Sequence, residues 1–187
     1  EIKKIKAIRN LPSTLENARK WILIGLYVGQ RVSDLLALKP SQLRFIESGV
    51  YIDINQQKTD KYVTVGVVDK EVIQILKQRF PYAISAQLFN RQIKQICQIA
   101  GIYEMVIGYK LCSKTRRKKL GTHPKYSLIS SHDLRRSFAT NYFGKIETPI
   151  LMQITGHSKE STFLSYIGSQ VNKDTYADAF MKIAATL

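Results

Sequence analysis

The 187-residue sequence is poor in the features that mark secreted, membrane-spanning or metal-binding proteins. Its two cysteines, Cys97 and Cys112, form no CxxC or Cys/His cluster, which argues against a disulfide framework and a structural metal. The longest apolar run, residues 21–28, falls far short of the roughly 18 residues that a membrane span needs. No signal-peptide pattern opens the chain. We therefore expect reduced thiols, no metal, no membrane association and a cytoplasmic location.

Acidic residues are also scarce. The chain has 14 Asp and Glu against 29 Lys and Arg, a net charge of +15, and it contains no carboxylate cluster of the kind that a two-metal nuclease uses. Residues 110–125 hold seven basic residues and no acidic one, yet the rest of the chain still has 22 basic against 14 acidic residues. The charge is therefore distributed as well as clustered. This pattern favours a surface that binds nucleic acid over one that binds an anionic membrane or an acidic protein.

Hydrophobic periodicity predicts a mainly α fold with a small antiparallel β-sheet, an α+β single domain over residues 1–187. Ser13, with Glu16 three positions on, and Ser33 fit helix N-caps. Strands at 50–54 and 63–67 form a hairpin with Lys58 at its tip. Residues 103–126 fit a loop or an exposed hairpin. The expected helices cover residues 13–28, 33–38, 69–78, 85–100, 131–143, 149–155, 159–167 and 172–185.

Three short motifs carry reactive side chains in the first three quarters of the chain. In GQRVSDL, Gly29 allows a tight turn and Arg31 stands at a helix start, where backbone N–H groups favour anions. Lys58 follows in the hairpin tip. His132 and Arg135 come next, and their i, i+3 spacing places both on one helix face. Each motif also has an ordinary interpretation, as a helix junction, a solvated lysine or a chance pair.

The fourth motif is Gly156-His157, which precedes Tyr166 by nine positions. We expect this Gly-His pair to start a helix that carries the tyrosine two to three turns along it. A single tyrosine is more often a core aromatic, so this motif is also weak by itself. The order and spacing of all four motifs together make a functional interpretation strong.

Read in this order, the chain resembles the tyrosine recombinases of the phage integrase type, whose pattern runs Arg, Lys, HxxR, GH and Tyr. The matching segments are VGQRVSDLLAL, QKTDKYVTV, SHDLRRSFATNYF and ITGHSKESTFLSYIG, within residues 14–168. Val28 stands where Thr is common, Asp34 replaces the more usual Glu, and Arg136-Ser137 replaces a frequent His-Thr. None of these departures removes a reactive group. The resemblance implies the DNA breaking-rejoining enzyme fold.

The resemblance also implies how a DNA phosphate is bound. Arg31 and Arg135 would hold the two non-bridging oxygens, since two planar guanidinium groups bind them bidentately and stay charged. His157 would add a hydrogen bond to the same oxygens. Asp34 would orient Arg31 from behind.

The implied reaction is site-specific recombination or integration of DNA through a covalent 3′-phosphotyrosyl intermediate, without metal, ATP or another cofactor. Tyr166 would attack the phosphate. His132 is the candidate base that takes the phenol proton. Lys58 is the candidate acid that protonates the departing 5′ oxygen, with its hairpin in the minor groove.

Double-stranded DNA is the expected partner. The residues expected to contact it are Lys58, Lys114, Arg116, Arg117, Lys118, Lys119 and Arg136. We expect a monomer alone and a homotetramer on synapsed DNA, with the C-terminal helix at 172–187 docked on a neighbouring protomer or on its own domain. The implied role is integration or excision of a mobile element at the nucleoid. Because the chain starts at Glu1, we also expect a fragment without core-binding and arm-binding domains that binds DNA weakly.

Two other classes of protein share parts of this pattern. A type IB topoisomerase or a telomere resolvase uses similar chemistry, but the small size and the compact spacing from His157 to Tyr166 favour a recombinase. A catalytically silent DNA-binding regulator would have no need for Lys58 and Tyr166 together.

Overall fold

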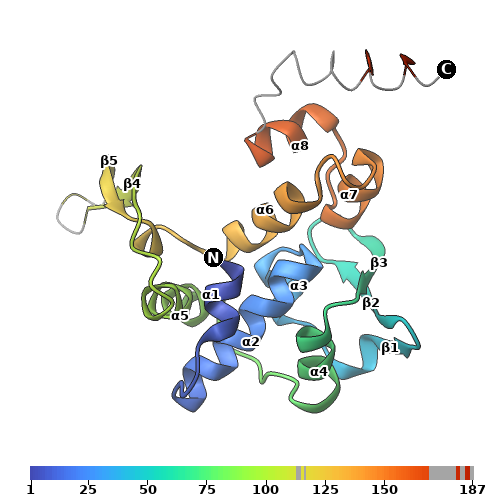
Figure 1. The fold of residues 1–187 in the computed structure, drawn as a ribbon, viewed down its shortest axis with the longest axis horizontal. Coiled ribbons are helices and arrows are strands. Elements are labelled where there is room, and N and C mark those ends of the chain that lie inside the picture. Colours follow the sequence, from blue (N-terminus) through green and yellow to red (C-terminus); the bar gives the residue numbers. More distant parts are fainter. Residues whose placement is uncertain (113–114, 116, 169–179, 182–183, 186–187) are drawn as a thin grey trace.

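The computed structural model describes residues 1–112, 115, 117–168, 180–181 and 184–185. It is mainly helical with a small antiparallel sheet, as predicted (Figure 1). Helix α1 and strand β1 were not expected, and the helix expected at 172–185 lies mostly outside the described residues. The elements are α1 (Ile2–Ala7), α2 (Ser13–Val28), α3 (Val32–Leu36), η1 (Pro40–Gln42), β1 (Leu43–Ile46), β2 (Gly49–Gln56), β3 (Lys61–Val67), α4 (Lys70–Gln78), α5 (Ala86–Ile99), β4 (Met105–Leu111), β5 (Lys118–Pro124), η2 (Lys125–Ser127), α6 (Ser131–Tyr142), α7 (Thr148–Thr155) and α8 (Glu160–Ile167).

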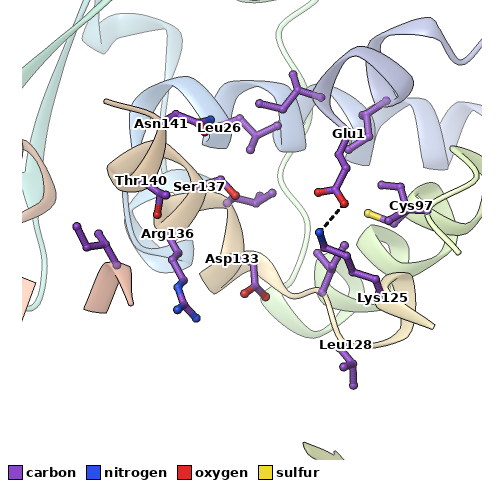
Figure 2. A pocket seen from close by; sticks show the side chains of 16 residues that line it. Glu1, Leu26, Cys97, Lys125, Leu128, Asp133, Arg136, Ser137, Thr140 and Asn141 are labelled. Carbon is purple, nitrogen blue, oxygen red and sulfur yellow. Dashed lines mark ion pairs between the residues drawn. The ribbon is translucent and has the colours of Figure 1, made fainter. Parts of the chain in front are cut away.

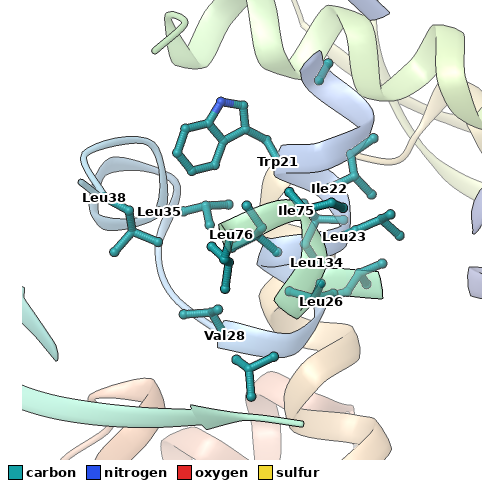
Figure 3. Packing of buried hydrophobic residues seen from close by; sticks show 14 of the residues in the cluster. Trp21, Ile22, Leu23, Leu26, Val28, Leu35, Leu38, Ile75, Leu76 and Leu134 are labelled. Atoms are coloured by element: carbon teal, nitrogen blue, oxygen red, sulfur yellow. The ribbon is translucent and has the colours of Figure 1, made fainter. Parts of the chain in front are cut away.

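Helix α2 lies at the centre of the fold and packs against α4, α5 and α6. Neighbouring elements cover several faces of α2, so apolar residues on almost all sides of this helix are buried. These residues form the middle of the main hydrophobic cluster (Figure 3). The one polar atom of Trp21 is also paired, since its indole N–H donates to the carbonyl of Tyr82 at 2.9 Å. Helix α2 is therefore a well-anchored base for the loop that follows it.

Both predicted N-caps at the start of the chain are wrong. Ser13 is the first residue inside α2, which has no side-chain cap. Glu16 cannot complete a capping box because its carboxylate binds Arg19, with 2.8 Å between Oε2 and Nε. Helix α3 begins directly after Arg31, so Ser33 lies within it.

The sheet has the order β1-β2-β3, and both pairs are antiparallel. Ile52, Ile54 and Gln56 alternate as the buried residues of β2, so a glutamine occupies the last position of an otherwise apolar stripe. Gln56 pairs with Lys61 across the hairpin, and residues 57–60 make the turn. The predicted hairpin with Lys58 in its tip is thus present.

The C-terminal helices α6, α7 and α8 enclose a second, smaller hydrophobic cluster. Its buried members are Phe138, Ala139, Leu151, Phe163 and Ile167. Gly156, with φ +64°, ends α7, and α8 begins only at Glu160. The expectation that the Gly-His pair starts a helix is therefore wrong, because a left-handed glycine terminates the preceding helix.

Strands β4 and β5 form a separate two-stranded hairpin between α5 and α6 that projects from the body (Figure 1). Of the two structures expected for residues 103–126, a loop or an exposed hairpin, the hairpin is therefore the correct one. Five apolar or aromatic side chains on the hairpin are strongly exposed, from 59% at Met105 to 77% at Ile107.

Candidate active site

One cleft of about 530 Å³ opens where the α2–α3 junction, the β2–β3 turn, α6 and the start of α8 meet. Elements from both halves of the chain build it, so residues more than a hundred positions apart share one surface. All six side chains predicted to be reactive line it, namely Arg31, Lys58, His132, Arg135, His157 and Tyr166.

Arg31 reaches the cleft through the turn that ends α2. Gly29 has φ +66°, and a Cβ at this position would overlap the ring of Phe138, so only glycine fits here. Arg31 follows two residues later and directly precedes α3. Its Nη1 is buried and has no hydrogen-bond partner within the described part of the chain. A buried guanidinium donor of this kind is well suited to bind an anion.

Arg135 is the more deeply buried of the two arginines, with 3% of its surface exposed. Its Nη1 donates to the carbonyl of Gly29 at 3.4 Å and its Nη2 to the carbonyl of Thr155. Burial, and then repulsion by Arg31, lowers the pKa of Arg135 to about 10. The group stays protonated at neutral pH, so the cleft holds two positive charges in a poorly hydrated setting.

The sequence predicts that Asp34 orients Arg31, but the structure, which describes both residues, shows no ion pair between them. Instead Asp34, which is 3% exposed, accepts a hydrogen bond at 3.1 Å from the backbone N–H of Gln57, while its Oδ2 has no hydrogen-bond partner among the residues that the structure describes. Its visible role is therefore to fix the turn that carries Lys58.

His157 is held in one tautomer by Thr155. The Thr155 hydroxyl lies 2.6 Å from the carbonyl of Leu151 and 2.8 Å from His157 Nδ1. A carbonyl only accepts, so the single hydroxyl proton points to Leu151 and Nδ1 must donate to the hydroxyl oxygen. In the neutral ring, Nε2 then carries a lone pair. Burial, followed by the charges of Arg135, Arg31 and His132, lowers the pKa of His157 to about 4, so the ring is neutral at pH 7.

Tyr166 lies among these groups near the end of α8. Its ring centroid is 5.0 Å from those of both His132 and His157, and the guanidinium carbon of Arg135 lies 5.9 Å from the ring. Its hydroxyl donates to the carbonyl of His132 at 3.3 Å. Burial raises the pKa of Tyr166, and the charge of Arg135 offsets part of this rise. The phenol is therefore protonated at neutral pH, and it would need a proton acceptor to act as a nucleophile.

The residues expected to contact DNA do not form one surface in the structure. Arg117, Lys118 and Lys119 are exposed on the β4–β5 hairpin, and Lys58 is exposed at the cleft. Lys114 and Arg116 lie outside the described residues.

Arg136 is not one of the residues that line the cleft. It lines a different hollow, of about 500 Å³, on the side of α6 that faces α1 and α5 (Figure 2). Glu1 and Lys125 form an ion pair of 2.6 Å across the edge of this hollow. Arg136 is exposed and does not line the cleft, but its positive charge acts on Tyr166 and opposes the rise in the pKa of that phenol.

Three residues that hold the cleft residues in place from behind were not identified from the sequence. Gln30 and Gln56 are buried and hydrogen-bonded to each other behind the cleft, and Thr155 holds His157. A signal was available for Gln56, because it is a polar residue at the buried position of an alternating strand. Gln30 and Thr155 have no comparable signal.

Neither a metal site nor a membrane span is found in the part of the chain that the structure describes. No three His, Cys, Asp or Glu side chains gather there in a way that could hold a metal ion. No helix there is long and apolar enough to cross a membrane. The cationic side chains that line the cleft are those of its two arginines, Lys58 and Lys159.

Comparison with known proteins connects this geometry to one family. The sequence matches the phage integrase family over residues 1–173. No curated protein matches it. The fold is similar to that of the XerH site-specific recombinase bound to difH substrate in a pre-cleavage complex, with a TM-score of 0.64 and 20% identity, over 95% of this chain and 50% of that one.

Two other solved structures are similar. A lambda integrase dimer bound to a COC′ core site has a TM-score of 0.61 and 18% identity, over 92% of this chain and 58% of that one. The XerA recombinase has a TM-score of 0.54 and 19% identity, over 94% of this chain and 64% of that one. The chain thus spans about half the length of the XerH chain that it matches.

Proposed function

Because the chain belongs to the phage integrase family, we propose that it is the catalytic domain of a site-specific recombinase that acts through a covalent 3′-phosphotyrosine. It cuts and rejoins double-stranded DNA without metal or ATP, in the integration or excision of a mobile element. The observation that carries this proposal is that six reactive side chains from four segments line one cleft.

Arg31 and Arg135 bind the scissile phosphate. The transition state of the transfer is a phosphorane, whose non-bridging oxygens gain negative charge, and each such donor contributes roughly 10²–10³ in rate. Two observations support this role. Arg31 Nη1 has no hydrogen-bond partner within the described residues, so an anion could accept from it, and an anion would also offset the repulsion between Arg31 and the buried Arg135. The arginines therefore supply the positive charge that metal ions provide in other nucleases.

Tyr166 is the nucleophile. Its Oη bonds to phosphorus while the bond from phosphorus to the 5′ oxygen breaks, so the phosphodiester energy is kept in the protein–DNA bond and the step is reversible. His132 accepts the phenol proton, and Lys58 donates a proton to the departing 5′ oxygen. The raised pKa of Tyr166 makes a nearby base necessary, and the His132 ring at 5.0 Å supports this assignment.

His157 donates a hydrogen bond to the phosphate only after it takes up a proton. In the free protein its Nε2 is an acceptor, because Nδ1 holds the proton against Thr155. A bound phosphate brings negative charge next to the ring and opposes the repulsion from Arg135 and Arg31 that lowers the pKa. DNA binding and proton uptake at His157 are therefore linked.

The remaining basic residues contact the DNA backbone outside the cleft. The exposed Arg117, Lys118 and Lys119 place a cationic hairpin on the surface. We extend the proposal to a homotetramer on synapsed DNA at the nucleoid, in which the C-terminal segment 172–187 docks on a neighbouring protomer. Most of that segment lies outside the described residues.

The test is formation of a covalent adduct on nicked duplexes tiled across the junctions of the element that encodes the chain. Tyr166→Phe should abolish the adduct and leave the dissociation constant for DNA unchanged. Tyr142→Phe is the matched control, because this tyrosine packs on the second cluster outside the cleft lining, and it should keep the adduct. An adduct that survives in Tyr166→Phe would refute the assignment of the nucleophile.

A further inference from the structure

We propose that Gln30 and Gln56 are positioning residues that hold the segments of Arg31, Lys58 and His157 in one arrangement. This inference rests on the proposed function, since it assigns roles relative to that cleft. Neither glutamine lines the cleft itself, and both are buried behind it, with 2% and 0% of their surfaces exposed.

The two side chains share a backbone acceptor in α7. The amide nitrogens of Gln30 and Gln56 donate to the carbonyl of Ile154 at 2.8 and 2.9 Å. Gln56 also donates to Gln30 Oε1 at 2.8 Å, and Gln30 donates to the carbonyl of Val28 at 3.1 Å. These four bonds join the end of α2, the end of β2 and the end of α7.

Only one orientation of each of the two side-chain amides satisfies all four hydrogen bonds. Each carboxamide has two N–H donors, and all four are used on three carbonyl oxygens. Reversing the amide of Gln56 would turn its oxygen toward two other oxygens, Gln30 Oε1 and the carbonyl of Ile154. The pair therefore specifies a single relative position of the three segments, which a pair of apolar side chains would not do.

Each end of the network is next to a cleft residue. Gln30 directly precedes Arg31 in the chain. Gln56 closes the Lys58 turn, because its backbone carbonyl accepts from the amides of Thr59 and Asp60 at 3.2 and 2.8 Å, and its Oε1 accepts from the Thr59 hydroxyl at 2.9 Å.

The same glutamine also borders the His157 segment. Gln56 Oε1 lies against Gly156, where a Cβ would overlap it, so the peptide before His157 rests on this carboxamide. The glycine of the Gly-His motif is thus required both by its positive φ and by the glutamine.

Stability alone does not account for two buried glutamines. A satisfied buried hydrogen bond adds little net stability, and apolar groups of the same shape often replace both partners at no loss. A displacement of about 1 Å in a reacting group, in contrast, lowers a rate by up to about 100-fold. The network is therefore better explained by the geometry of the cleft than by the stability of the fold.

The test compares Gln30→Met, Gln56→Met and the double variant with Gln92→Met. Gln92 is a matched control because it is also buried and bonded to one backbone carbonyl, Thr14 O at 3.3 Å, but lies in α5 away from the cleft. We expect the single-turnover rate of adduct formation to fall about 10- to 100-fold in both single variants, with DNA affinity within about two-fold of wild type. The double variant should be no slower than the slower single one, because the two residues share a bond. Gln92→Met should retain the wild-type rate.

A second measurement does not depend on cleavage. Amide hydrogen exchange at Thr59 and Asp60 should speed up in Gln56→Met and stay slow in Gln92→Met. The positioning role is overturned if Gln30→Met and Gln56→Met keep the wild-type rate, or if Gln92→Met is equally slow. If the wild-type protein forms no adduct, the proposed function fails, and unchanged exchange at Thr59 and Asp60 would then overturn the positioning role as well.

Discussion

His157 offers a prediction in which the tautomer and the charge of one ring are both tested. Its pKa is lowered from 6.5 to about 4 in the folded protein, so the unfolded chain binds the proton more tightly. Stability from the neutral ring is complete above pH 6.5, is lost as the pH falls through the window from 6.5 to 4, and levels off below it. The change to make is His157→Gln, which removes the titration and keeps a polar side chain.

The size of the effect follows from these two pKa values. Linkage gives a loss of about 2 kcal/mol in the free energy of unfolding between pH 7 and pH 5. Because the ring is only partly buried, screening by solvent reduces this to about 1–2 kcal/mol. The difference in stability between wild type and His157→Gln should therefore shrink by that amount as the pH is lowered.

The assay is urea unfolding of both proteins at pH 7 and pH 5, since taking the difference cancels the titration of the carboxylates that they share. A difference that does not change with pH would refute the reasoning. Nitrogen-15 spectra of the imidazole give an independent check, because the free protein at pH 7 should carry its proton on Nδ1. Thr155→Val should abolish this preference, and a wild-type ring protonated on Nε2 would also contradict the assignment.

Three other predictions follow from the cleft and the hairpin. Arg135→Lys should slow adduct formation by about 10²–10³, because lysine carries its donors on one nitrogen and lacks the forked Nη1 and Nη2 that bind Gly29 O and Thr155 O, and a wild-type rate in a single-turnover assay would contradict this. Chelation with EDTA should leave adduct formation intact, and its loss would count against the arginine-based mechanism. Replacing residues 117–119 with alanine should lower the slope of log affinity against log salt by up to about 2.7, at about 0.9 per phosphate contact, whereas alanine at the exposed Lys70 and Lys77 of α4 should leave it unchanged.

The six candidate residues that line the cleft could be selected from the sequence because each belongs to a short local motif. The spacing of His132 and Arg135 fixes a common helix face, and the alternation of β2 and β3 leaves Lys58 in a turn. The order of these short motifs along the chain was then enough to recognise the resemblance to the tyrosine recombinases. The fold class was predictable for the same reason, since periods of 3.6 and 2 are local properties of the sequence.

The hydrogen bonds that hold the cleft segments together could not be predicted, because they join residues that are far apart in the sequence. Gln30 donates to a carbonyl 124 positions away, and no local pattern indicates such a bond. Helix α1 is a similar case: its six residues are too few for a periodic signal, and it is held by tertiary contacts such as the 2.6 Å ion pair between Lys6 and Asp69. The capping box predicted at Ser13 failed because Arg19 binds the carboxylate of Glu16, and the cap predicted at Ser33 failed because α3 begins one residue earlier, at Val32.

The division of the interior into two hydrophobic clusters has a consequence for when the cleft is complete. Leu134 and Phe138 of α6 belong to the larger and the smaller cluster respectively, so α6 joins the two. Tyr166 packs on the smaller one, which buries far less apolar surface than the cluster around α2 and is expected to open at a lower free energy. Local unfolding of α8 would withdraw the phenol while Arg31 and Lys58 stay in place on the folded body. Under the proposed mechanism, the fraction of molecules ready to attack a phosphate would then be set by the stability of this small part of the protein, and apolar substitutions inside it would change that fraction.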